Sequence, residues 1–292
     1  DVSYSDIFKD AALLQLTATC WSIDRKLPPA LLAEVGNVDY LKGRKLLLDP
    51  ESTAPIKQIT GKARNYIRKL ALPFPIRGCV LVPRKLIPAI QDQLSTFKND
   101  YECSVESFLY WYPSAMTEAA EKLGELFDQL DYPSADQLKG RFRFEWRYLT
   151  VGPSTSRILP ASLYQEEMTK FKELMAQARQ EAEEALRMEF VDLVSNLTDK
   201  LNGTDGTPKR LRSSAVENLH EFLSHFDDRN IFQDEQLESL VQQCKSIVDG
   251  VSPARLRTDV SFKTEMHGKM SELLAAIDQS LENLPRRKIR MS

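Results

Sequence analysis

The chain has 292 residues, enough for one or two domains with a sizeable core. Its 39 basic and 42 acidic residues give a formal net charge of −3, which excludes a globally basic nucleic-acid binder and allows only a local basic patch. Glycine is scarce, at 11 residues, and no stretch is long and apolar enough to span a membrane. The composition therefore favours a helical fold, with the cytoplasm as the expected location and no membrane partner.

The N-terminal part of the chain, from Ile7 to about Leu48, has apolar residues at irregular helical steps. Pro28-Pro29 interrupts this pattern, which predicts two or three short helices. Trp21 is expected in the core that these helices form.

A helix and a strand follow in the next forty residues. The spacing of 3, 4, 4 and 3 between apolar residues predicts a helix that ends before Pro73, with these positions on one face: Ile56, Ile59, Ala63, Ile67 and Leu70. The run Cys79-Val80-Leu81-Val82 is short, β-branched and bounded by Gly78 and Pro83, which predicts a buried strand.

Helical periodicity resumes from Leu86 to about Tyr112 and again from Ser114 to Leu130. Four aromatic residues then alternate with charged ones between Phe142 and Tyr148, which is the period of a half-buried strand. This strand is expected to pair with the one near Val80. The result is a small two-strand β element packed on helices, because a lone ribbon of this size is not stable.

A long helix is predicted after Pro160, where about 40 residues lack both glycine and proline. Its apolar residues keep alternating steps of four and three before the register shifts at Leu186: Tyr164, Met168, Phe171, Met175, Ala178, Ala182 and Ala185. Such a heptad seam requires a partner helix.

The remaining chain is predicted to be helical. A loop at residues 202–208 and an amphipathic helix from Leu211 to Phe226 indicate a long antiparallel coiled-coil-like hairpin. Two more helices are expected, at Leu237–Val248 and from about Arg255 to Leu284. The fold class is therefore mainly α, with an N-terminal domain at 1–157 and a long-helix bundle at 158–292.

No motif in the chain predicts catalysis. The four cysteines are far apart and without companion histidines, which disfavours a zinc site. His220 and His225 nearly form a zincin motif, but they lie five positions apart, and this spacing places them about 140° apart around a helix. Walker, SxxK and di-iron patterns are incomplete. We expect no catalytic residue, cofactor or metal, and hence no enzyme.

Charge is strongly polarised between two segments. Residues 42–88 hold eleven basic and two acidic side chains, whereas residues 101–140 hold eight acidic and two basic ones. The two segments can face each other or solvent, or the basic one can bind phosphates or an acidic partner. The candidate binding residues are Lys57, Lys62, Arg64, Arg68, Lys69, Arg77, Arg84 and Lys85. A second basic cluster, Arg286-Arg287-Lys288-Ile289-Arg290, closes the chain.

The order of these features resembles a known family. It includes Trp21, a basic helix leading to Gly78-Cys79-Val80-Leu81-Val82-Pro83, the long Glu/Ala-rich helix and the residues near Leu256-Arg257-Thr258-Asp259. The chain is similar to an uncharacterised bacterial family of unknown function that is often encoded in mobile elements and phages. Its genes lie beside those of a MoxR-type AAA ATPase and a von Willebrand-A protein that resembles cobaltochelatase subunits. This resemblance implies an accessory role near an ATPase and no catalytic residues.

Two main functions remain open. The first is a non-enzymatic adaptor or accessory subunit that binds other proteins, among them the AAA ATPase and its von Willebrand-A partner. The second is a nucleic-acid-binding subunit of a mobile-element or defence complex, which uses the basic segment 42–85. An enzyme with an unrecognised site is the weakest alternative.

Overall fold

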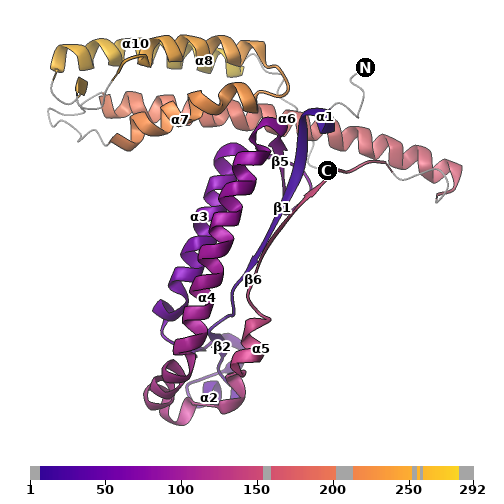
Figure 1. Ribbon diagram of the computed structural model, residues 1–292, viewed down its shortest axis with the longest axis vertical. Helices are drawn as coiled ribbons and strands as arrows, with labels where there is room; N and C mark the ends of the chain where they lie inside the picture. The colour runs from indigo at the N-terminus through magenta and orange to yellow at the C-terminus, as the bar shows by residue number, and fades with distance from the viewer. Residues whose placement is uncertain (1–6, 154–158, 202–212, 252–254, 257–258, 283–292) are drawn as a thin grey trace. The chain divides into compact units, whose positions relative to one another are not determined.

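The computed structural model describes residues 7–153, 159–201, 213–251, 255–256 and 259–282 (Figure 1). The chain is mainly helical with a small amount of sheet, as predicted. It divides into two compact units. Unit 1 comprises residues 1–13, 69–86 and 150–292, and unit 2 comprises residues 14–68 and 87–149. The proposed domains 1–157 and 158–292 stay a prediction, and the two units do not follow that division, because residues 69–86 group with the C-terminal part.

Unit 2 is built on two long helices, α3 (Ala54–Leu70) and α4 (Ile87–Leu123), of which the last two residues of α3 belong to unit 1. The inward face predicted for α3 is confirmed, since Ile56, Ala63 and Ile67 are buried. Shorter elements complete the unit: α2 (Pro29–Ala33), α5 (Ala135–Lys139), strand β6 (Arg143–Leu149), and the 3-10 helices η1 (Val38–Tyr40), η2 (Pro50–Thr53), η4 (Gly124–Leu126) and η5 (Gln129–Asp131).

Helix α4 corrects the prediction of two helices at residues 86–112 and 114–130. It runs through Pro113, which cannot donate a backbone hydrogen bond to the carbonyl of Leu109. Tyr112 and Ala119 are buried on either side of the proline, and this packing holds the helix together across the lost bond. Tertiary burial therefore outweighs the local penalty.

The prediction of only short helices between Ile7 and Leu48 is wrong. After the single turn α1 (Ile7–Asp10), the chain forms strand β1 (Ala11–Thr19), and β2 (Asp24–Lys26) pairs antiparallel with β3 (Arg44–Leu46). Alanine, leucine and glutamine in β1 are good helix formers, so the local sequence favoured a helix. Pairing with neighbouring strands overrides that preference, as is common for β structure.

The main sheet has four strands in the order β4-β5-β1-β6, with β4 (Leu72–Pro73) antiparallel to β5 (Cys79–Pro83). Both predicted strands exist, as β5 and β6. They are not neighbours, however, because β1 lies between them. The expected two-strand element is therefore a four-stranded sheet plus the β2-β3 ribbon.

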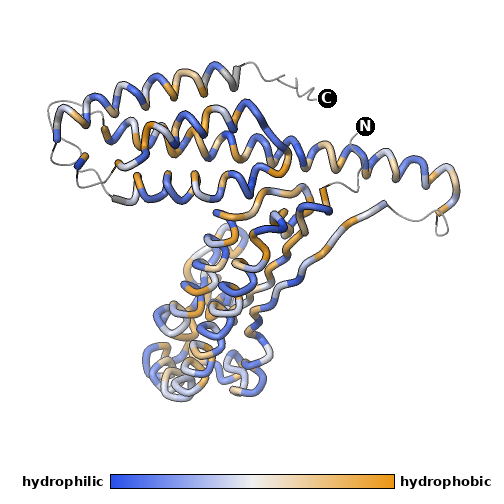
Figure 2. Tube along the Cα trace, turned by 45° about the horizontal axis from the view of Figure 1, so that its top comes forward, coloured by the Kyte–Doolittle hydropathy of each residue, from blue (hydrophilic) through white to orange (hydrophobic). Residues whose placement is uncertain are grey.

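Unit 1 contains the long helix α6 (Ala161–Leu201), followed by α7 (Ser213–Arg229), α8 (Glu235–Val248) and α10 (Val260–Glu282). Helix α6 packs against α7 and α10, and α10 packs against α8. Phe190 of α6 stacks on Phe222 of α7 with ring centroids 5.6 Å apart. Figure 2 shows hydrophobic and hydrophilic residues alternating along these helices, as in amphipathic helices that share a core. The predicted loop 202–208, Leu284 and the basic cluster 286–290 lie outside the described residues.

Also in unit 1, η3 (Arg84–Leu86) contacts α1, and α6 contacts β4. The core of this unit combines residues of the sheet, such as Leu72 and Leu81, with residues of all four long helices. The sheet residues of unit 1 are therefore anchored on the helical core.

Candidate functional site

The eight predicted binding residues are all exposed, but they divide equally between the two units. Unit 2 holds the four members on the first fifteen positions of α3: Lys57, Lys62, Arg64 and Arg68. Unit 1 holds the last α3 lysine, one residue between β4 and β5, and two residues of η3: Lys69, Arg77, Arg84 and Lys85. The basic segment is continuous in sequence, but its members belong to two separately packed bodies.

In unit 1, two of these lysines form ion pairs with helix α7. Lys69 Nζ lies 2.6 Å from Glu221 Oε2, and Lys85 Nζ lies 3.3 Å from Asp228 Oδ1. All four side chains are at least one-third exposed, so each pair contributes at most about 1 kcal/mol to stability. Part of the charge expected to bind a ligand is thus compensated inside the unit.

In unit 2, two arginines of α3 use one guanidinium nitrogen within the chain. Arg64 Nη2 donates a hydrogen bond to the Ala18 carbonyl of β1 at 3.3 Å, and Arg68 Nη2 donates to Asn65 Oδ1 at 2.9 Å. Burial raises the pKa of the Cys20 thiol, and the nearby Lys57 ammonium opposes that shift. Lys57, Arg64 and Arg68 remain exposed, so α3 keeps a modest basic outer face.

The acidic stretch 101–140 pairs with the basic segment through Lys45. Its Nζ lies 2.7 Å from Asp131 Oδ2 and donates to the Leu126 carbonyl, also at 2.7 Å. Arg25 adds a weaker contact to Asp131, at 3.7 Å. Among the described residues, none of the eight candidate binding residues pairs with this stretch; the acidic partners of Lys69 and Lys85 lie on α7.

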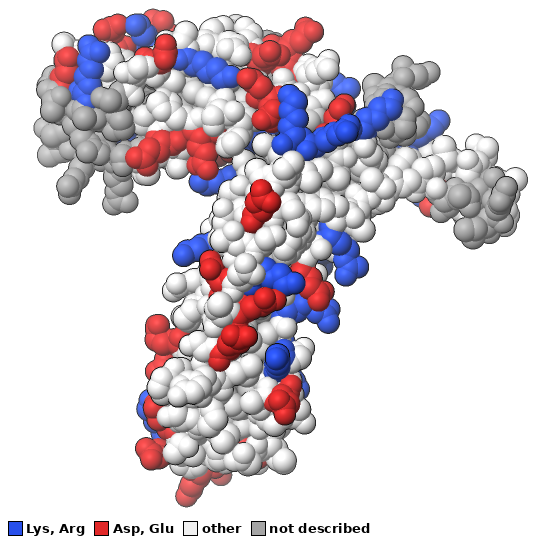
Figure 3. All heavy atoms as spheres, viewed as in Figure 1, with Lys and Arg blue, Asp and Glu red and all other residues white. Residues whose placement is uncertain are grey.

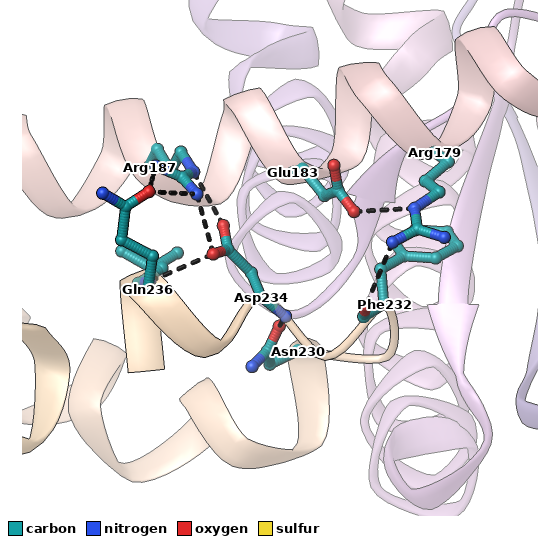
Figure 4. Close-up of polar contacts among 8 residues, drawn as sticks. Arg179, Glu183, Arg187, Asn230, Phe232, Asp234 and Gln236 are labelled. Atoms are coloured by element: carbon teal, nitrogen blue, oxygen red, sulfur yellow. Dashed lines mark hydrogen bonds and ion pairs between the residues drawn. The ribbon is translucent and has the colours of Figure 1, made fainter. Parts of the chain in front are cut away.

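A buried ion pair fixes the turn between α7 and α8 onto α6 (Figure 4). Arg187 of α6 donates from Nε and Nη2 to the two carboxylate oxygens of Asp234, each at 2.7 Å. Asp234 Oδ1 also accepts from the Leu237 backbone N–H at 3.0 Å and thereby caps α8. Both charged side chains are more than nine-tenths buried. This bidentate, fully occupied arrangement is typical of a structural clamp, not of a catalytic group.

About two turns nearer the start of α6, Arg179 makes a second contact with the connection between α7 and α8. Its Nε donates to Glu183 Oε1 at 2.8 Å, and its guanidinium lies 5.7 Å from the centroid of the Phe232 ring (Figure 4). Together with Arg187, it ties the α7-α8 turn to the middle of α6.

The first part of α6, residues 161–174, differs from the rest of this helix. Every buried residue of α6 lies at Met175 or beyond, although the heptad seam begins at Tyr164. Phe171 and Leu174 pack partly against the core, whereas Leu163 is 39% exposed and Tyr164 and Met168 are partly exposed. We name Leu163, Tyr164 and Met168 the open seam.

The figures agree with this description of the open seam. In Figure 1 the start of α6 extends beyond α7, α8 and α10, within the same unit. On the face drawn in Figure 3, uncharged atoms predominate over that part of α6. The open seam is a partly exposed strip of apolar side chains at the start of α6, and it is our candidate functional site.

The described residues contain no group of three or more His, Cys, Asp and Glu side chains arranged to hold a metal ion. His220 and His225 both lie on α7, five positions apart. No helix among the described residues is long and apolar enough to cross a membrane.

Sequence reasoning missed the partners of the basic residues. Glu221 and Asp228 are more than 140 positions away from the lysines that they contact, and no local pattern links them. Asp234 had a readable signal, since an aspartate followed by Glu235 and an apolar run is typical of a helix N-terminus. The ion pair between Asp234 and Arg187 had no such signal in the sequence, because the two residues are 47 positions apart.

Comparison with known proteins gives one match. Residues 8–249 match the model of a family described as "Protein of unknown function (DUF3150)". Searches of curated proteins and of solved structures found no match.

Proposed function

This chain belongs to the DUF3150 family of proteins of unknown function, and from that premise we propose that it is a non-enzymatic adaptor that binds a protein partner through the open seam of α6. Membership confirms the predicted resemblance to an uncharacterised family. The neighbouring MoxR-type AAA ATPase and von Willebrand-A protein stay predictions, and they are the partners that we propose to test first.

One observation carries the proposal: the heptad pattern of α6 continues into residues 161–174, none of which is fully buried in the described chain. Tyr164 and Met168 belong to the same heptad seam as Met175 and Ala178, and the latter two are buried in the core of unit 1. Apolar surface left in water costs roughly 25 cal/mol per Å2, so a partner that covers it gains that free energy. A helix with its own apolar heptads fits the seam as a coiled-coil partner.

The charged residues beside the open seam already satisfy one another. Lys170 Nζ lies 2.7 Å from Glu166 Oε1 and 2.9 Å from Glu167 Oε1. The hydrogen bond from Lys170 lowers the pKa of the Glu166 carboxyl. Because Lys170 already pairs with both glutamates, we expect apolar heptad pairing to select the partner more than charge does.

A second candidate function, nucleic-acid binding through residues 42–85, rests on the exposed outer face of α3. Lys57, Arg64 and Arg68 lie on it, and phosphates bind such clusters. Two observations weaken this alternative: the ion pairs of Lys69 and Lys85 with α7, and the division of the eight residues between two units.

Affinity purification from cells that produce the tagged full chain with its neighbouring genes distinguishes the two. The variants are Met168→Asp in the open seam, Met188→Asp as its control, and the triple change of Lys57, Arg64 and Arg68 to Glu. Met188 is 53% exposed on the same helix, outside the seam, so both methionine variants should fold.

We expect Met168→Asp to lose a stoichiometric protein partner that the control and the triple variant retain. If the triple variant instead loses co-purified nucleic acid and Met168→Asp loses nothing, the adaptor proposal through α6 is wrong and the alternative is favoured.

A further inference from the structure

A second apolar surface lies on unit 2, along helix α4. Two cavities of about 330 and 290 Å3 adjoin there, since Ser52 and Ala115 line both. On α4 they extend from Cys103 to Leu123, which at ~1.5 Å per residue is roughly 30 Å. We name this surface the α4 groove. Its length suits an extended or helical segment better than a compact small molecule.

The floor of the α4 groove is rigid. Phe108 and Tyr112 are 6% and 4% exposed, and their rings lie 6.4 and 5.9 Å from the Trp21 ring behind them. The Tyr112 hydroxyl donates to the Pro133 carbonyl at 3.0 Å, and burial raises the pKa of that hydroxyl to about 12. A floor fixed in this way is preformed, which lowers the entropic cost of binding.

Exposed apolar side chains stand at the groove. Trp111 lines it and is 63% exposed, Tyr110 packs edge-on against Trp111 with centroids 5.0 Å apart, and Leu46 in the second cavity is 46% exposed. Tryptophan and tyrosine are enriched among the residues that dominate protein interfaces, because they bury a large area and keep one polar group.

The charge around the groove is acidic. Residues 103–123, the stretch of α4 along the groove, include three acidic residues and one lysine. Asp49 and Glu118 line the second cavity, and the one basic lining residue, Lys122, lies 3.8 Å from Glu118. Nucleic acid is disfavoured here, since its phosphates would approach carboxylates. A cationic partner is favoured.

We propose that the α4 groove binds a basic amphipathic helix of a partner protein, with an apolar side chain against Trp111 and its Lys or Arg residues toward Asp49 and Glu118. The length, the apolar floor and the acidic rim each select for this occupant. The inference extends the proposed adaptor function by a surface on the other unit. It does not depend on the open seam, so either surface can fail its own test alone.

Fluorescence anisotropy with the full chain tests this. The probe is a fluorescein-labelled 16-residue amphipathic peptide of leucine and lysine, and its counterpart has glutamate in place of lysine. The groove variants are Trp111→Ala and Glu118→Lys. Their controls are Tyr40→Ala, an 88% exposed aromatic outside the groove, and Glu34→Lys, which makes the same charge change at an exposed position of the same unit.

We expect the lysine peptide to bind the parent and both controls, and to bind Trp111→Ala at least about tenfold more weakly, with a smaller loss for Glu118→Lys. High salt should weaken binding. Three results would each overturn the proposal: no binding of the lysine peptide, equal binding of the glutamate peptide, or unchanged affinity of Trp111→Ala.

A second measurement needs no variant. Cys103 is exposed and lines the groove, so a saturating lysine peptide should slow its alkylation by iodoacetamide in the parent protein. An unchanged alkylation rate would place the peptide elsewhere and contradict the proposal. Binding that Met168→Asp abolishes would also contradict it, because α6 would then be the site.

Discussion

The two parts of helix α6 share one heptad pattern and differ in what covers them. All ten buried residues of α6 lie between Met175 and Leu201, whereas no residue of 161–174 is buried. Helix α6 contacts α7, α10 and strand β4. Periodicity therefore predicts which face of a helix is apolar, and it does not predict whether the chain itself or another molecule covers that face. In this protein, partner binding at the uncovered part is the proposal that the following experiments test.

The largest loss of stability is expected when the buried ion pair between Arg187 and Asp234 is broken, because this pair fixes the turn between α7 and α8 onto α6. Asp234→Ala leaves the buried Arg187 guanidinium without its carboxylate and removes the cap of α8. We expect the free energy of unfolding to fall by about 3–5 kcal/mol for the lost pair, and by about 1 kcal/mol more for the cap. Urea denaturation followed by circular dichroism measures this change.

The control for that variant is Asp227→Ala. Asp227 pairs with Lys245 at 3.1 Å but is 62% exposed, so its loss should change stability by less than about 1 kcal/mol. Equal effects of the two substitutions would show that Arg187 and Asp234 do not form a buried pair.

A core truncation tests the covered part of α6 directly. Phe190 is fully buried and stacked on Phe222, so Phe190→Ala should cost about 3–5 kcal/mol of stability. Met168→Ala in the open seam should cost under about 1 kcal/mol of stability, because the Met168 side chain is partly exposed and its removal leaves no enclosed cavity. Similar costs in the same denaturation assay would mean that residues 161–174 are covered after all.

The reactivity of two cysteines gives a second comparison between a buried and an exposed position, Cys244 on α8 and Cys103 on α4. Burial raises the pKa of the Cys244 thiol to about 12, whereas Cys103 on α4 is exposed. Alkylation at pH 8, followed by intact mass, should modify Cys103 more than about tenfold faster than Cys244, since the thiolate is the reactive form.

The raised pKa also sets a pH dependence. The folded state favours the protonated Cys244 thiol, so its contribution to stability is complete below the ordinary pKa near 9 and is lost as pH rises toward 12. Melting temperatures between pH 8 and 12 should fall less steeply for Cys244→Ala than for the parent. If the melting temperatures of the parent and of Cys244→Ala fell in parallel with pH, ionisation of the Cys244 thiol would not contribute to this pH dependence.

The smallest effects are expected for the lysines that contact α7. Lys69→Ala and Lys85→Ala each remove an exposed ion pair, and each should change the free energy of unfolding by less than about 1 kcal/mol. A loss comparable to that of Asp234→Ala would show that these pairs hold the core.

Much of the helical part of the fold follows from the sequence, because many of the periodic apolar positions of α3 and of residues 175–201 of α6 are also buried. Strand β1 did not follow, since its leucines, alanines and glutamine favour a helix until neighbouring strands pair with it. The partner of β6 was missed for the same reason, as β1 was not expected to be a strand.

The candidate sites show a similar limit. The heptad seam was readable, but its partial cover depends on where α7 and α10 pack. The basic segment was readable as a run of charge, but its division between Arg68 and Lys69 depends on long-range packing. Trp111 and Tyr110 gave no distinct signal, because adjacent aromatic residues occur on buried and exposed helix faces alike.

Site-specific photo-crosslinking tests the central claim, that the open seam contacts another protein, most directly. A benzophenone amino acid replaces Met168 or, as control, Met188, in cells that also express the neighbouring genes. We expect a crosslink from position 168 to a different protein and none from position 188. No crosslink from position 168, or the same crosslink from both positions, would contradict it.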